Sequence, residues 1–116
     1  GLIKSKNIVS SELSHGDQKL LDIALALCLK PKLLLLDEPT AGMGPEERWK
    51  MIDRIKELWK KTKITIVFIE HDMDIVFGIA QKIFVLQQGA ILAEGNPQEI
   101  KKNQKVIKAY LGGGKK

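Results

Sequence analysis

Four consecutive leucines, Leu33–Leu36, run directly into two carboxylates, Asp37 and Glu38, and this stretch constrains the fold more than any other. A strand buried on both faces is continuously apolar, and such strands are typical of parallel sheets covered by helices. Ligands in open α/β sheets bind at the carboxyl ends of the strands. The stretch therefore predicts a buried parallel strand that places Asp37 where it could hold Mg²⁺ and Glu38 where it could activate a water beside a nucleotide phosphate.

The composition fits one small globular domain. The chain has 116 residues, of which 44% are hydrophobic and 28% are charged, and its formal net charge is +5. The lysines are spread over element ends and tails, with no basic stripe interleaved with aromatics, which argues against nucleic-acid binding. The single cysteine, Cys28, lies in an apolar run and is expected to be a small core residue. No apolar stretch reaches the ~20 residues of a membrane span.

Helix signals stand on both sides of the leucine strand. Ser14 and Asp17 have the form of a capping box at the start of an apolar helix, and Lys30-Pro31 ends that helix. Gly44–Glu47 supplies a cap, a proline at the first helical position and two acids that oppose the helix dipole. The helix that begins there is expected to close at Lys60-Lys61.

A second apolar strand, Ile64–Ile69, also ends in an acid, Glu70. Downstream, the pattern predicts a short helix over about residues 73–80, a hairpin of strands 83–86 and 90–93 around Gln88-Gly89, a helix capped by Asn96 and Glu99, and a last helix over about 105–111. The expected fold is therefore α/β, with parallel core strands flanked by helices and a C-terminal hairpin with short helices. Residues 1–111 would form the domain portion, and residues 112–116 a flexible tail.

Four motifs together resemble the ATPase domain of ATP-binding-cassette (ABC) transporters. Leu13–Gln18 is similar to the family signature, usually LSGGQ, and Leu33–Glu38 is similar to the Walker B strand. Pro39–Pro45 resembles the D-loop, and His71 resembles the switch histidine. The motifs stand in family order and the resemblance covers about residues 10–111. It implies that the chain is part of a P-loop NTPase-type domain.

The resemblance implies catalytic roles for three residues, with ATP and Mg²⁺ as cofactors. Asp37 would hold Mg²⁺ through water, Glu38 would polarise the attacking water as general base, and His71 would contact the γ-phosphate. Taken alone, Asp37 also fits a turn residue and His71 a surface residue. Two adjacent acids at a buried strand end repel each other unless a cation or a task offsets the repulsion, which favours the functional interpretation.

The resemblance also implies a partner that carries the same fold. Ser14, Gly16 and Gln18 of the signature would contact ATP held by a second ATPase subunit, and Gly42 belongs to the D-loop. Free N–H groups at a helix start bind anions, and glycine lets the backbone approach a phosphate closely. Ser14 with Asp17 could also serve only as a helix cap. Further implied partners are transmembrane permease subunits and, indirectly, an external solute-binding protein, with the ATPase cytoplasmic on the inner face of the cell membrane.

Several residues depart from the usual family pattern or narrow it. His15 and Asp17 replace the usual Gly and Gln of the signature, and Gly44 stands where the D-loop usually has Asp. The combination of motifs most resembles ATPase subunits of branched-chain amino-acid importers. The Val85–Gly95 segment is also similar to urea and amide importers, so the transported solute has two alternatives.

No G-x-x-x-x-G-K-[ST] phosphate-binding loop occurs in the sequence. The chain is therefore expected to be the C-terminal half of an ABC ATPase domain, inactive in ATP hydrolysis by itself. One alternative is an ABC-like half that serves only in dimerisation or regulation, which would not need Glu38 and His71. Another is an ABC ATPase outside transport, but such proteins usually carry a long insertion, for which the interval from Ser14 to Asp37 has no room.

Overall fold

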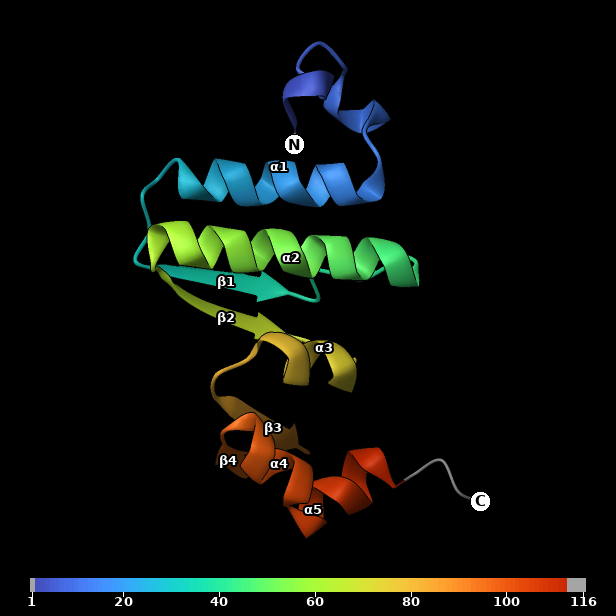
Figure 1. The fold of residues 1–116 in the computed structure, drawn as a ribbon, viewed down its shortest axis with the longest axis vertical. Helices are drawn as coiled ribbons and strands as arrows, with labels where there is room; N and C mark the ends of the chain where they lie inside the picture. Colours follow the sequence, from blue (N-terminus) through green and yellow to red (C-terminus); the bar gives the residue numbers. More distant parts are fainter. Residues whose placement is uncertain (1, 113–116) are drawn as a thin grey trace. The chain divides into compact units, whose positions relative to one another are not determined.

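The computed structural model describes residues 2–112 (Figure 1). These residues form two compact units, of which the first ends at His71 and the second begins at Asp72. Within residues 2–112, no helix is both long and apolar enough to cross a membrane. The flexible tail expected over residues 112–116 falls outside the described residues except for Gly112. The division into a domain portion and a tail stays a prediction.

The first unit contains a parallel pair of strands and two helices. Its elements are η1 (Leu2–Ser5) and η2 (Ser10–Glu12), both 3-10 helices, then α1 (His15–Leu27), β1 (Leu33–Asp37), α2 (Pro45–Thr62) and β2 (Thr65–Ile69). β1 and β2 pair in parallel with Leu33 opposite Thr65 and Asp37 opposite Ile69. Parallel strands need a crossover connection, and α2 provides it (Figure 1). The strands and helices expected in this part are confirmed.

Helix α2 begins and ends as its sequence predicts. Gly44 is the N-cap residue and Pro45 occupies the first turn, where its missing N–H leaves no bond unmade. Lys50 forms a hydrogen bond and an ion pair with Glu46 at 2.9 Å, and this contact lowers the pKa of the Glu46 carboxyl below its ordinary value. The helix ends at Lys63, whose left-handed backbone lets its N–H donate to the Trp59 carbonyl oxygen at 2.8 Å.

Only one face of the β1–β2 pair is buried by the described residues. The buried apolar side chains of this unit are Ile23, Leu34, Met43, Met51, Ile52 and Ile55. On the other face, Leu35 is 68% exposed and Ile69 is 63% exposed, and Leu33 and Val67 are half exposed. The prediction of a strand buried on both faces is therefore wrong for residues 2–112. Successive side chains of a strand point to opposite faces, and the described elements cover one of them.

The prediction that Cys28 is a core residue is also wrong, because its side chain is exposed. Cys28 is the C-cap residue of α1, where the helix ends and its apolar run no longer faces a neighbouring element. An apolar run therefore extends past the last buried position of this helix.

The second unit is a hairpin with short helices. Its elements are α3 (Met73–Ile79), β3 (Ile83–Gln87), β4 (Ala90–Gly95), α4 (Pro97–Lys102), α5 (Gln104–Val106) and η3, a short π-helix (Ile107–Leu111). Gln88 and Gly89 join the antiparallel strands with φ angles of +50° and +78°. Positive φ at both central residues is the mark of a type I′ turn, whose twist matches that of a hairpin. The predicted hairpin and its turn are confirmed.

The core of the second unit brings the hairpin against its helices. Ile83, Ile100 and Val106 are buried together, and Val76, Phe77, Ala80, Val85 and Ala93 pack against them. Asn96 and Glu99 form the predicted capping box, with each side chain accepting from the other's backbone N–H at 2.9 Å. The last helix differs from the prediction, because α5 gives way to the wider η3, from which the Tyr110 hydroxyl donates to the Leu86 carbonyl oxygen.

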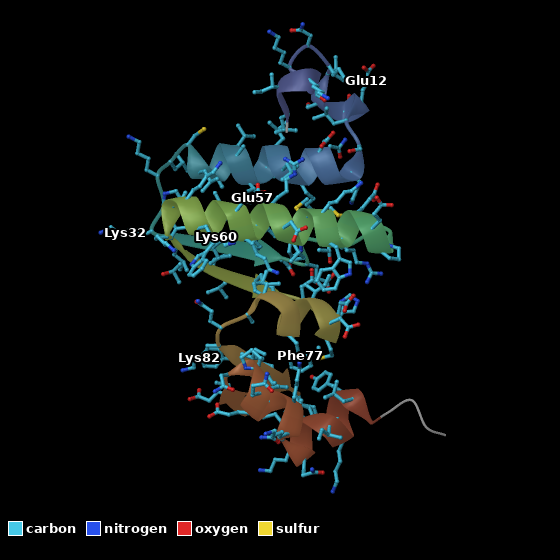
Figure 2. All side chains as sticks on the ribbon, in the orientation of Figure 1. Glu12, Lys32, Glu57, Lys60, Phe77 and Lys82 are labelled. Carbon is cyan, nitrogen blue, oxygen red and sulfur yellow. The ribbon has the colours of Figure 1, made fainter. Side chains whose placement is uncertain are left out.

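Positive charge is spread over the elements of the chain. Figure 2 labels Lys32 ahead of β1, Lys60 on α2 and Lys82 ahead of β3, and all three side chains are exposed. These three lysines come from three separate places in the chain.

Candidate functional site

The two acids that follow the leucines stand at the carboxyl end of the parallel pair. Asp37 is the last residue of β1 and is exposed, and Glu38 follows it with a φ of +43°. A left-handed backbone is uncommon for a residue other than glycine and persists only where surrounding contacts impose it. One such contact is the Glu38 N–H, which donates to the Ile69 carbonyl oxygen at 2.8 Å. The ladder between the strands thus extends one residue beyond β1.

The structure brings Glu38 and His71 into direct contact. The Nδ1 atom of His71 lies 3.1 Å from Oε1 of Glu38, and the two side chains are 81% and 45% exposed. A carboxylate only accepts, so when Glu38 is ionised the proton of this hydrogen bond is on Nδ1 of His71. Exposed pairs contribute at most ~1 kcal/mol to stability. The contact therefore matters more for what it can do chemically than for holding the fold.

A second pair of side chains joins the same two segments, and sequence reasoning missed it. The Thr40 backbone N–H and hydroxyl both donate to Oε1 of Glu70, at 3.2 Å and 2.8 Å. Thr40 is 4% exposed, and Glu70 is partly buried. The available signals were an acid at the end of the second strand and a threonine in the loop after the first. Nothing local in the sequence indicates that the two side chains meet.

The signature residues occupy the first turn of α1. The Ser14 side chain caps the helix by accepting from the Asp17 N–H at 3.1 Å. The Gln18 amide reaches back and donates to the carbonyl oxygens of Ser10 at 3.2 Å and Leu13 at 3.3 Å. The Gln18 side chain thus holds the segment ahead of the helix. Of the predicted capping box, the structure has the bond from the Asp17 N–H to the Ser14 hydroxyl but none from the Ser14 N–H to the Asp17 carboxylate. The N-terminus of a helix is a favourable place for an anion.

The D-loop residues lie against the start of α1. Gly42 has a φ of +76°, and a Cβ atom there would lie 3.3 Å from Nε2 of His15. A Cβ atom on Gly16 would lie 3.9 Å from the Met43 side chain, which is an ordinary contact. The signature and the D-loop, which are separate in the sequence, are therefore neighbours within the first unit.

Asp37, at the end of β1, is the carboxylate that the sequence assigns to Mg²⁺. No group of three or more His, Cys, Asp or Glu side chains within residues 2–112 is arranged to hold a metal ion. Mg²⁺ keeps most of its waters and commonly takes one or two carboxylates together with substrate phosphates. An exposed carboxylate such as Asp37 at the end of β1 fits that requirement.

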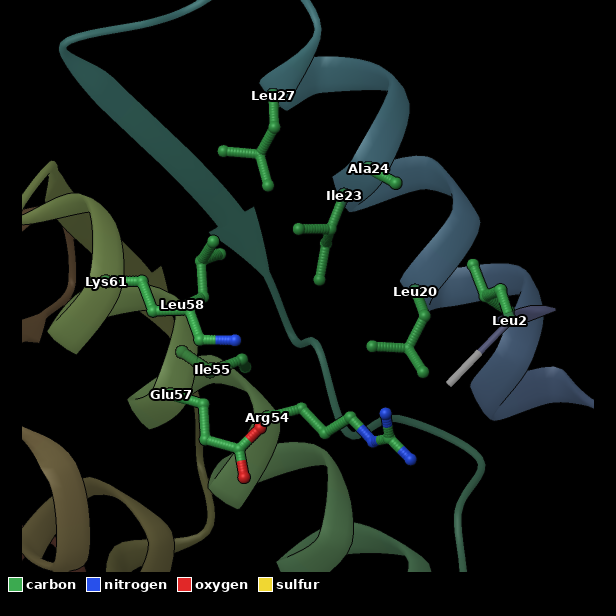
Figure 3. A pocket seen from close by; sticks show the side chains of 10 residues that line it. All are labelled: Leu2, Leu20, Ile23, Ala24, Leu27, Arg54, Ile55, Glu57, Leu58 and Lys61. Atoms are coloured by element: carbon green, nitrogen blue, oxygen red, sulfur yellow. The ribbon is translucent and has the colours of Figure 1, made fainter.

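A pocket of about 300 Å³ lies between η1, α1 and α2, apart from the predicted site residues (Figure 3). Leu20, Ile23 and Leu27 of α1 face Ile55 and Leu58 of α2 across it. Arg54, Glu57 and Lys61 add charged groups to the lining. No predicted site residue lines this pocket, so it is not the site of the phosphate chemistry.

Two family profiles match the sequence. The profile described as "ABC transporter" matches residues 2–41, and the profile described as "Branched-chain amino acid ATP-binding cassette transporter" matches residues 90–116. The first range contains the signature and the Walker B strand, and the second begins at β4.

Curated relatives extend the likeness over nearly the whole chain. The high-affinity branched-chain amino acid transport ATP-binding protein LivG of Salmonella typhimurium is 46% identical over 97% of this chain and 44% of its own length. The corresponding protein BraF of Pseudomonas aeruginosa is 41% identical over 96% of this chain and 44% of its own length. The chain thus spans less than half the length of these relatives.

Solved structures share the fold. The ATP-binding cassette MJ1267 of an ABC transporter superposes with a TM-score of 0.78 at 34% identity, over 90% of this chain and 42% of the other. The cbiO1 protein of Clostridium perfringens, part of the ABC transporter complex cbiONQ, superposes with a TM-score of 0.76 at 37% identity, over 86% of this chain and 40% of the other. The predicted α/β fold, part of a P-loop NTPase-type domain, is confirmed.

Proposed function

The chain belongs to the ABC transporter ATP-binding family as the C-terminal part of a branched-chain amino acid member, and on that premise we propose that it supplies the hydrolytic residues of a transport ATPase. In this proposal the complete subunit hydrolyses ATP and couples the hydrolysis to transport across the cell membrane. The 116 residues alone lack a phosphate-binding loop and are inactive. The observation that carries the proposal is the contact between Glu38 and His71.

The contact supports a division of work between the two side chains. Glu38 is the general base that takes a proton from the attacking water, and His71 orients the Glu38 carboxylate through Nδ1 and contacts the γ-phosphate. General bases of this kind contribute about 10²- to 10⁴-fold to a rate.

Asp37 and the start of α1 complete the proposed machinery. Asp37 holds Mg²⁺ through water, and the ion supplies neutralisation of charge on the phosphates. Ser14, Gly16 and Gln18 contact the ATP of a second ATPase subunit, with Gly42 of the D-loop beside them. Closure of two such subunits on ATP, and opening after hydrolysis, then drives the permease between two access states at the inner face of the membrane.

The solute we propose is a branched-chain amino acid. The relatives named for that transport match nearly the whole chain, and the corresponding family profile matches residues 90–116. These observations favour branched-chain amino acids over the urea and amide alternative. The alternative is an ABC-like module that serves only in dimerisation or regulation. If the chain has that role, replacing Glu38 or His71 should leave its binding to partner proteins unchanged.

The test is ATP-dependent uptake by the complete transporter in membrane vesicles. We expect leucine, isoleucine or valine uptake that needs ATP and that disappears when Glu38 is replaced by Gln. Uptake of urea in place of these amino acids would overturn the solute assignment alone. An unaltered rate with Glu38→Gln would overturn the catalytic proposal.

A further inference from the structure

We propose that Glu70 is a positioning residue which, through Thr40, holds the Glu38 backbone in place and keeps the Glu38 carboxylate against His71. The inference rests on the proposed function and assigns a role to the contact between Glu70 and Thr40, for which the proposed function has no use so far. Glu70 touches no reacting group in this proposal, because it acts through the loop that carries Glu38.

The first observation is that three contacts tie this loop to the end of β2. The Glu38 N–H donates to the Ile69 carbonyl oxygen at 2.8 Å, and the Glu38 carboxylate lies 3.1 Å from His71 Nδ1. Two residues further on, Thr40 donates twice to Glu70 Oε1. All three contacts therefore join two short stretches of chain, Glu38–Thr40 on one side and Ile69–His71 on the other.

The second observation is the backbone of Glu38. Glu38 has a φ of +43°, a left-handed conformation that residues other than glycine adopt only where surrounding contacts impose it. The Glu38 N–H fixes the chain before this residue, and the Thr40–Glu70 bonds fix it afterwards. The Ala41 N–H also donates to the Glu38 carbonyl oxygen at 3.0 Å, so this turn bond and the Thr40–Glu70 bonds hold the chain after Glu38 together. Loss of the Thr40–Glu70 bonds leaves the turn bond alone, and the Glu38 carboxylate is then held less firmly against His71.

The third observation is that the Thr40–Glu70 pair is sheltered while the Glu38–His71 pair is not. Thr40 is 4% exposed, whereas the His71 side chain is 81% exposed. A hydrogen bond to a carboxylate that is shielded from water is stronger than an exposed ion pair, which water and salt screen. The sheltered pair is therefore the stronger tie, and the exposed contact depends on it.

Four variants of the complete ATPase subunit test the inference. Thr40→Val removes the hydroxyl donor with little change of shape, and Thr40→Ser keeps it. Glu70→Ala removes the acceptor of both bonds. Thr62→Val is the matched control, because the Thr62 hydroxyl also donates at 2.8 Å, to the Leu58 carbonyl oxygen within α2.

The kinetic readout is a split between kcat and KM. We expect Thr40→Val to lower kcat for ATP hydrolysis about 10-fold while KM for ATP changes less than about twofold, because Thr40 helps to position a catalytic group and touches no nucleotide in this proposal. Glu70→Ala is expected to lower kcat further. Thr40→Ser and Thr62→Val should both keep the parental kcat, and a Thr40→Val enzyme with parental kcat would overturn the inference.

Hydrogen–deuterium exchange of the same variants gives a readout that does not depend on hydrolysis. Peptides that cover residues 38–44 should take up deuterium faster in Glu70→Ala and Thr40→Val than in the parent, and at the parental rate in Thr62→Val. Unchanged exchange in Glu70→Ala would overturn the positioning role. If the parent subunit does not hydrolyse ATP but exchange responds as expected, the proposed function fails and the structural tie stands.

Discussion

The carboxylate of Glu38, at the end of β1, lies 3.1 Å from the imidazole of His71, which follows the residue after β2. The parallel register explains the meeting, because Asp37 pairs with Ile69 and the next residues leave the sheet at the same edge. In the proposed ATPase, this contact links the general base to the residue that orients it. The following predictions concern the complete subunit unless the 116-residue chain is named.

Replacing Glu38 by Gln should preserve ATP binding and stall hydrolysis. Glutamine keeps the size and one acceptor oxygen but cannot take up the proton, so the rate should fall by about 100-fold or more. An ATP-bound dimer should accumulate, and size-exclusion chromatography with ATP detects it. Asp53→Asn on the exposed face of α2 is the control and should change neither quantity. Parental turnover with Gln at this position contradicts the general-base assignment.

Replacing His71 by Ala should also depress turnover, by on the order of 100-fold, because a hydrogen-bonding group aimed at the reacting centre is lost. ATP hydrolysis and uptake are the measurements. His71→Gln restores one donor in place of the ring and should recover part of the rate. If alanine leaves both activities near normal, His71 is only a surface residue.

The 116-residue chain by itself should bind ATP weakly or not at all and should not hydrolyse it. The reason is the absence of a phosphate-binding loop, whose backbone N–H groups and lysine hold the phosphates in proteins that carry it. Titration calorimetry with Mg²⁺ and ATP measures the binding. If a trace of ATP hydrolysis is seen, the Glu38→Gln variant of the chain shows whether it comes from a contaminating ATPase. Hydrolysis that disappears in this variant belongs to the chain and refutes the prediction.

Replacing Gly42 by Ala should lower the free energy of unfolding by about 1–2 kcal/mol, because an L-residue pays that much for a left-handed φ. The new Cβ atom would also lie 3.3 Å from His15 Nε2, so the His15 ring would have to move. Urea titration measures the change. Gly16→Ala is the matched control, since its Cβ atom would meet Met43 at an ordinary 3.9 Å. Equal stability of the two variants argues against strain at Gly42.

The exposed face of the β1–β2 pair should make the 116-residue chain self-associate. Leu35 and Val67 lie on this face, and contiguous exposed apolar surface promotes association. Leu35→Lys should shift the chain toward monomer in sedimentation velocity. Leu29→Lys is the control, because Leu29 is 84% exposed but lies outside the strands. A monomeric parent, or equal effects of both substitutions, contradicts the prediction.

Locally determined features could be predicted from the sequence. Gly44-Pro45 starts α2, Asn96 and Glu99 form a capping box, and Gln88-Gly89 makes the hairpin turn. In each case the residues that determine the feature lie within four positions of one another in the sequence. The local sequence is therefore enough to predict it. The same holds for the placement of Asp37 and Glu38 at a strand end.

Features that depend on distant residues could not be predicted. The Thr40–Glu70 contact joins residues thirty positions apart, and no periodicity encodes it. The exposed face of β1 was not predicted for a different reason. Its leucines indicate that both faces of the strand are suited to burial, but the described residues cover only one of them. Cys28 shows the same limit at the end of a helix. The pattern of apolar residues thus correctly predicted which segments form helices and strands. It did not predict which of their faces the rest of the described chain covers.

The parallel pairing of β1 with β2 also sets an order of folding events. Its partners are separated by all of α2, so the chain must close a long loop before the first ladder bond forms. The β3–β4 hairpin closes over two residues, and such hairpins form in about 1–10 μs. Because local pairings form faster than pairings between distant residues, the edge that carries Glu38 and His71 is expected to assemble after the hairpin downstream of it.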